Sequence, residues 1–82
     1  MKLPRDVGGA DLAKLLSSCG YRISHQTGSH LRLTSSIKGK EHRLTLPNHR
    51  PLKVGTLSAI LSDVASYLEM NKQELIAQLF RT

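Results

Sequence analysis

Four histidines lie in the middle of this 82-residue chain, and His30, which follows Gly28 and Ser29, has the most informative neighbours. An imidazole takes up and releases a proton near neutral pH. Such a group can remove the proton of a ribose 2′-hydroxyl or protonate a departing 5′ oxygen, while nearby cations stabilise charge on the phosphate. His30 with Arg32 and Arg43 would supply these groups without a metal or cofactor. The alternative interpretation is an exposed strand histidine without a chemical role.

Zinc binding is a competing interpretation of the histidines, since imidazole is the commonest zinc ligand. The spacing argues against it, because His25 and His30 flank a turn and His42 is expected on the opposite strand face from the basic side chains. No metal or cofactor is therefore expected. Cys19, the single cysteine, cannot form an internal disulfide and is interpreted as a helix-face hydrophobe. Neither Cys19 nor Ser29 lies in a nucleophile elbow or triad context.

The positive charge of the chain is concentrated at its centre. The net charge is +6, and the segment 21–55 accounts for the whole excess, because the remainder has equal numbers of acidic and basic residues. The basic residues of this segment are Arg22, Arg32, Lys38, Lys40, Arg43, Arg50 and Lys53. A basic centre in a neutral frame is typical of a phosphate-binding surface. Charge alone does not distinguish a phosphate-binding surface from a basic surface that only keeps the protein soluble.

The hydrophobic pattern predicts one α+β domain spanning residues 1–82, with a three-stranded antiparallel sheet and helices on one face, in the order α-β-β-β-α-α. Leucines at helical spacing, with Gly20 as a stop, indicate the first helix. The predicted segments are a helix at 9–19, strands at 21–26, 29–34 and 42–46, and helices at 54–68 and 72–80.

Side-chain alternation along the strands predicts which residues face away from the helices. Leu31 and Leu33 are expected in the core, as are Leu44 and Leu46. A slip of one residue would invert this arrangement at the cost of exposing leucines. The open face is then expected to carry Arg22, Ser24, Gln26, His30, Arg32, Thr34, Arg43 and Thr45.

A second candidate anion site precedes the predicted helix at 54–68. Lys53 stands before the helix N-terminus, whose free N–H groups attract anions, and Gly55 permits a close approach. The alternative is that Gly55 and Thr56 only define the helix start. The preceding loop 47–53 is basic and carries His49 between two prolines.

No apolar run approaches the roughly 18 residues needed to span a bilayer. The segment 1–9 also lacks the apolar region of a signal peptide. A soluble, cytoplasmic protein without a membrane partner is therefore expected.

Several short motifs together resemble the HicA-type mRNA interferase toxins, also called the YcfA-like family. The resemblance covers nearly the whole chain, and the order and spacing of the motifs are more specific than any one of them. Its parts are Asp11 to Leu16 leading to Gly20-Tyr21, Gln26-Thr27-Gly28-Ser29-His30, Leu44 to His49, Lys53 to Leu57, and Ile60-Leu61.

The resemblance implies a double-stranded-RNA-binding-like fold and ribosome-independent RNA cleavage by the toxin of a type II toxin–antitoxin system. It implies that His30 is catalytic and that a HicB-type antitoxin covers the active face. We expect RNA contacts from Arg22, Ser29, Arg32, Arg43, His49 and Lys53. His25 departs from the family, which often has arginine there, and the loss of a permanent charge is expected to change RNA affinity or specificity. A non-catalytic RNA-binding module and a protein-interaction subunit using the same face are the alternatives.

Overall fold

The computed structural model describes residues 3–80 as an α+β fold, and the predicted order α-β-β-β-α-α is confirmed. A short 3₁₀ turn, Ser17–Cys19, follows the first helix. The elements are α1 (Gly9–Leu16), β1 (Arg22–Gln26), β2 (His30–Ser35), β3 (His42–Pro47), α2 (Val54–Leu68) and α3 (Lys72–Leu79).

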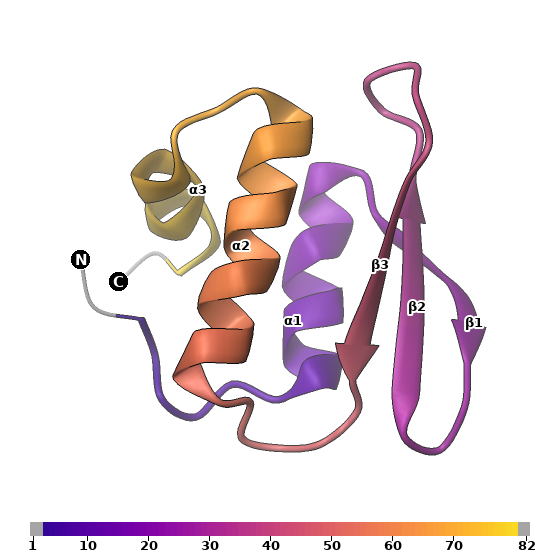
Figure 1. The fold of residues 1–82 in the computed structure, drawn as a ribbon, viewed down its shortest axis with the longest axis vertical. Helices are drawn as coiled ribbons and strands as arrows, with labels where there is room; N and C mark the ends of the chain where they lie inside the picture. The colour runs from indigo at the N-terminus through magenta and orange to yellow at the C-terminus, as the bar shows by residue number, and fades with distance from the viewer. Residues whose placement is uncertain (1–2, 81–82) are drawn as a thin grey trace.

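The three strands form an antiparallel sheet in the order β1-β2-β3, so β2 is central. In the described part of the chain the helices lie on one side of the sheet and leave the other side uncovered, and α3 packs against α2 (Figure 1). The same view shows the β1–β2 turn, the end of β3 and the N-termini of α1 and α2 at one end of the molecule (Figure 1). Side chains from several segments can therefore meet at that end.

The core confirms the leucine alternation of β2 and β3. Leu31 and Leu33 of β2 are 2% and 0% exposed, and Leu44 and Leu46 of β3 are 5% and 0% exposed. Burying a leucine side chain stabilises a fold by about 1.5–3 kcal/mol, so the register of β2 and β3 is strongly fixed. The helices contribute the fully buried Leu12, Leu16, Leu57, Leu61, Val64 and Leu75.

The first helix is shorter than the predicted segment 9–19. It begins with the Asp11 carboxylate accepting a hydrogen bond from the Gly8 N–H at 2.9 Å. At the other end the Ser17 and Ser18 hydroxyls donate to backbone carbonyls three residues earlier, at 2.6 and 2.8 Å. Such bonds compete with helical ones, and the chain tightens into the 3₁₀ turn before Gly20 adopts a left-handed φ of 92°.

The longest helix in residues 3–80 is α2, with 15 residues. A bilayer-spanning helix needs about 20 apolar residues. None of the helices of this region is long and apolar enough to cross a membrane.

Strand β1 contains a bulge that corrects one expectation. Ile23 pairs with β2 in ordinary register, Ser24 is an extra residue, and His25 then lies opposite Arg32. Because an extra residue shifts the two-residue alternation, His25 joins the open face and Gln26 turns to the helix side. The placement of Gln26 on the open face was therefore wrong.

Candidate functional site

The turn between β1 and β2 holds His30 through two backbone contacts with Thr27. The Thr27 N–H donates to the His30 carbonyl at 2.9 Å, and the His30 N–H donates to the Thr27 hydroxyl at 3.0 Å. Gly28 and Ser29 form the tip. These bonds fix the first residue of β2, so the backbone beneath the His30 ring is well defined.

Asn48, which follows β3, braces the same turn from the other side. Its backbone N–H donates to the Ser29 carbonyl at 2.9 Å, and its side-chain amide donates to the Gly28 carbonyl at 3.4 Å. Sequence reasoning assigned Asn48 only to a loop. The pairing of His30 with Pro47 is what brings the end of β3 to the turn.

The His30 side chain is exposed on the open face and is oriented by its neighbour. The Ser29 hydroxyl lies 3.0 Å from His30 Nδ1, in a hydrogen bond whose direction depends on the imidazole tautomer. When Nδ1–H donates to Ser29, the Nε2 lone pair is available to accept a proton. The pair thus provides an oriented imidazole.

A cavity of about 320 Å³ opens beside this imidazole. It is lined by His25, Thr27, His30, Arg32 and Thr45. The cavity therefore combines two groups that can exchange protons with one permanent cation. Sequence reasoning did not assign His25 to the site, because strict alternation along β1 placed it on the helix side.

A second, shallow cavity of about 370 Å³ lies alongside the first and shares His25 and Arg32 with it. It gathers Arg22 and Arg43 as well, so the three strand arginines expected on the open face do come together. We call the group Arg22, His25, His30, Arg32 and Arg43 the basic face. Three guanidinium groups at one surface can bind successive phosphates.

Arg43 already has a carboxylate partner on this surface. Its Nη2 lies 2.7 Å from Glu41 Oε1, and both side chains are largely exposed. An exposed pair of this kind is weak, typically about 0–1 kcal/mol, so a phosphate can displace the carboxylate.

His49 and Lys53 lie outside these two cavities. His49 lines a cavity of about 210 Å³ at the start of α1, and its carbonyl accepts a hydrogen bond from the Gly9 N–H at 3.1 Å. A Cβ at Gly9 would lie 2.0 Å from the Pro47 carbonyl oxygen, so only glycine permits this approach of helix and loop. Lys53 is the exposed N-cap residue of α2.

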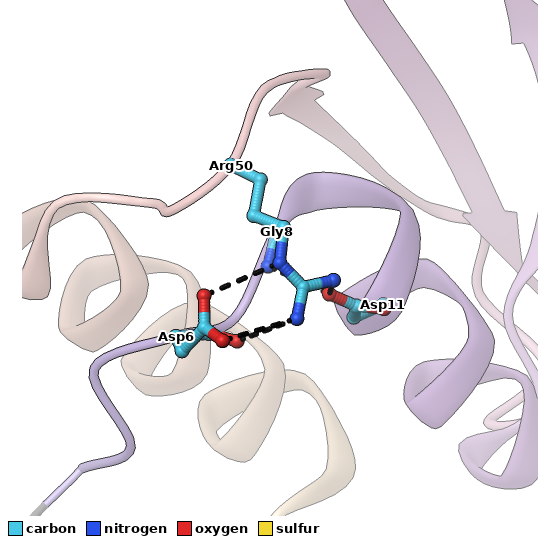
Figure 2. Close-up of polar contacts among 4 residues, drawn as sticks. All are labelled: Asp6, Gly8, Asp11 and Arg50. Carbon is cyan, nitrogen blue, oxygen red and sulfur yellow. Dashed lines mark hydrogen bonds and ion pairs between the residues drawn. The ribbon is translucent and has the colours of Figure 1, made fainter.

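Arg50 belongs to the central positive excess, but its charge is matched by two carboxylates. Its Nε lies 3.2 Å from Asp6 Oδ1 and its Nη1 lies 2.7 Å from Asp11 Oδ2 (Figure 2). The hydrogen bond from Arg50 and its charge lower the pKa of Asp6. The contacts tie the loop before α2 to the N-terminal segment, so Arg50 has a structural role.

His42 is enclosed by residues of other elements. Tyr21 bonds to His42 Nδ1 at 2.7 Å, Asp63 lies 3.3 Å from Nε2, and the Tyr67 ring stacks on the imidazole with centroids 4.6 Å apart. Burial, followed by the nearby Tyr67, Asp63 and Cys19 groups, raises the pKa of Tyr21. This cluster links β3 to α2 on the helix side of the sheet. Within residues 3–80 no group of three or more His, Cys, Asp or Glu side chains could hold a metal ion.

Comparison with known proteins finds a match to a protein-family model. A family model described as the HicA toxin of bacterial toxin–antitoxin matches residues 9–65. Neither a curated protein nor a solved structure matches the chain. The matched segment is well over half of the 82 residues and contains every residue of the basic face. The chain therefore belongs to the HicA toxin family of bacterial toxin–antitoxin systems.

Proposed function

We propose that this protein is an mRNA interferase, a metal-independent endoribonuclease that acts in the cytoplasm as the toxin of a type II toxin–antitoxin pair. The observation that carries the proposal is the position of His30. Its imidazole lies on the uncovered side of the sheet, in a cavity that also contains Arg32, within a chain of the HicA toxin family.

His30 is the proton-transfer residue in this proposal. RNA can be cleaved by its own 2′-hydroxyl once a base removes the hydroxyl proton, and an acid assists departure of the 5′ oxygen. Arg32 stabilises the charge that develops on the phosphate. Ser29 holds the ring through Nδ1, 3.0 Å away, and so leaves Nε2 for the substrate. An imidazole and a guanidinium supply these functions from the chain itself.

The rest of the basic face binds the RNA backbone. Arg22 and Arg43 flank the His30 cavity, where they contact phosphates on either side of the scissile bond. Ser29, His49 and Lys53 lie at or near the same end of the molecule and extend the contacts beyond the cavity. Contacts of this kind give affinity that depends strongly on salt.

A HicB-type antitoxin is the proposed protein partner. The family pairs a toxin with an antitoxin, and the uncovered side of the sheet presents the proposed active groups on one surface. A partner with acidic or neutral residues would compete with RNA for the three arginines. Covering that single surface is enough to block cleavage.

Cleavage of a purified transcript in the presence of a chelator tests the proposal. The wild-type protein is expected to cut the RNA, and His30→Ala is expected to lose at least about 100-fold in rate while remaining folded. Gln26→Ala is the matched control, because Gln26 is on the adjacent strand but faces the helix side.

Three outcomes would contradict parts of this proposal. Equal cleavage by His30→Ala and the parent would remove His30 from the mechanism. Salt-dependent RNA binding without cleavage would identify a binding module instead. Failure to bind RNA at low salt would leave the basic face as a protein-interaction surface.

A further inference from the structure

We propose that His25 is a second catalytic residue, which acts with His30 as the other half of an acid–base pair. The inference rests on the proposed function, because it requires that RNA is cleaved in the cavity of His30. Two observations support it: the bulge carries His25 onto the open face, and the two imidazoles line one cavity.

The placement of His25 is built into β1. Ser24, the extra residue, donates its hydroxyl proton to the Arg32 carbonyl at 3.2 Å and accepts a hydrogen bond from the Thr34 hydroxyl at 2.9 Å. These bonds connect the bulge to two residues of β2. His25 follows directly and lies opposite Arg32. An unbroken register would have placed it opposite Leu31, on the helix side. The bulge therefore serves to aim a side chain, as bulges beside functional sites commonly do.

The shared cavity has a size and lining suited to a piece of RNA backbone. Its volume of about 320 Å³ is at the lower end of the range for ligand pockets. Each lining side chain carries nitrogen or oxygen, with two imidazoles, one guanidinium and two hydroxyls. A phosphodiester held by Arg32 at this site would share the cavity with one imidazole from β1 and one from β2.

Two imidazoles allow both proton transfers of RNA cleavage to occur together. One neutral ring accepts the 2′-hydroxyl proton as O2′ forms a bond to phosphorus. The other ring, protonated, gives its proton to O5′ as the bond between phosphorus and O5′ breaks. The products are a 2′,3′-cyclic phosphate and a 5′-hydroxyl. The bond between O2′ and phosphorus replaces the bond between phosphorus and O5′, and one ring gains a proton as the other loses one. A single histidine would have to perform these transfers in separate steps.

The charged groups around the two rings come from all three strands and the loop before β3. They are Arg22, Arg32, Glu41 and Arg43. Guanidinium groups stay protonated through the neutral range. The two limbs of a bell-shaped pH–rate profile are therefore assigned to the two imidazoles.

The test is the pH dependence of kcat/KM for the full chain and its variants. The substrate is an oligoribonucleotide spanning a cleavage site first mapped on a transcript. His25→Gln keeps a polar side chain, His25→Arg keeps a positive charge, and Gln26→Ala is the control on the helix side. His25 variants are expected to lose about 100-fold at the optimum and one limb of the profile. His25→Arg retains RNA affinity, which separates catalysis from binding.

A second substrate carries sulfur in place of the scissile 5′ oxygen. Thiolate leaves without protonation, so the variant that lacks the acid regains rate on this substrate and the variant that lacks the base does not. One of His25→Gln and His30→Gln is therefore expected to be rescued.

The outcomes separate this inference from the proposed function. Suppose that His30→Ala is inactive but His25→Gln keeps both limbs of the pH–rate profile and at least about a fifth of the parent rate. His25 is then not the second catalytic residue, and the proposed function stands. If the wild-type protein binds RNA without cutting it, the proposed function fails and the inference fails with it.

Discussion

At the scale of single residues, a comparison of Gly20, which precedes β1, with Gly28, in the β1–β2 turn, shows which glycine is required by the fold and which is not. Gly20 has a φ of 92°, and a Cβ there would lie 2.9 Å from the Ile37 side chain. Gly28 at the tip of the turn has neither a positive φ nor any atom within 4 Å of an added Cβ. The fold therefore does not require glycine at this position, and the bare backbone there leaves room for RNA to approach.

Gly28→Ala is accordingly expected to separate folding from function. The thermal midpoint should equal that of the parent, because the new methyl group meets nothing. The value of kcat/KM for RNA should fall about 10-fold, mostly through KM, because the methyl group displaces the RNA backbone at the tip. Steady-state cleavage with parallel thermal unfolding measures both. Unchanged cleavage would show that RNA does not pass over the turn.

At the scale of elements, the stability of the packing between α1 and the loop after β3 depends on ionised groups. Arg50 reaches both Asp6 before α1 and Asp11 within it (Figure 2). The Arg50 hydrogen bond and charge lower the pKa of Asp6 below its ordinary value of 3.8. The stabilisation that the ionised Asp6 contributes is therefore complete at pH values above 3.8. It is lost as the pH falls through the lower pKa that Asp6 has in the folded protein.

Asp6→Asn tests this contribution, because asparagine does not titrate. The free energy of unfolding of the parent should decline as the pH is lowered below 3.8, and the variant should decline less steeply over the same interval. Denaturant unfolding measured between about pH 2 and 6 gives both curves. Parallel curves would mean that the Arg50 contact does not stabilise the folded protein.

The elements also show why part of the site could be predicted and part could not. In β2, alternation between Leu31 or Leu33 and the polar residues fixes the register, so the orientations of His30 and Arg32 follow from burial. Strand β1 offers no such signal, since all five residues are exposed and Ile23 is itself 50% exposed. A bulge there costs no buried leucine, and alternation alone could not reveal it.

At the scale of the whole molecule, the sequence gives the amount of charge but not its pairing. The central excess of +6 predicts a basic centre but does not show which of its charges have acidic partners. In the structure Arg50 is bound to carboxylates at the start of α1, and Lys38 lies 3.6 Å from Glu69. The arginines of β1, β2 and β3 remain together on the uncovered side of the sheet. The electrostatic surface available to RNA is therefore narrower than the sequence indicates.

RNA affinity should reflect these three arginines. With the inactive His30→Ala protein, the logarithm of the binding constant is expected to fall linearly with the logarithm of salt concentration. Arg43→Gln should reduce the slope by about 0.7, the value for one phosphate contact on a single strand. Glu41→Gln should strengthen binding, because it frees Arg43 from the carboxylate at 2.7 Å. A slope unaffected by Arg43→Gln would exclude that contact.

The bulge also makes the site sensitive to the register of β1. Removing Ser24 would leave Ile23 opposite Leu33 and His25 opposite Arg32, so the His25 ring would stay on the open face. Keeping Ser24 but pairing it opposite Arg32 would instead place His25 opposite Leu31 and turn its ring toward the helices, while every side chain of the cavity remained in the sequence. A slip of one residue at an exposed edge strand, where loss of core packing is small, would then have the same effect on catalysis as replacing the histidine.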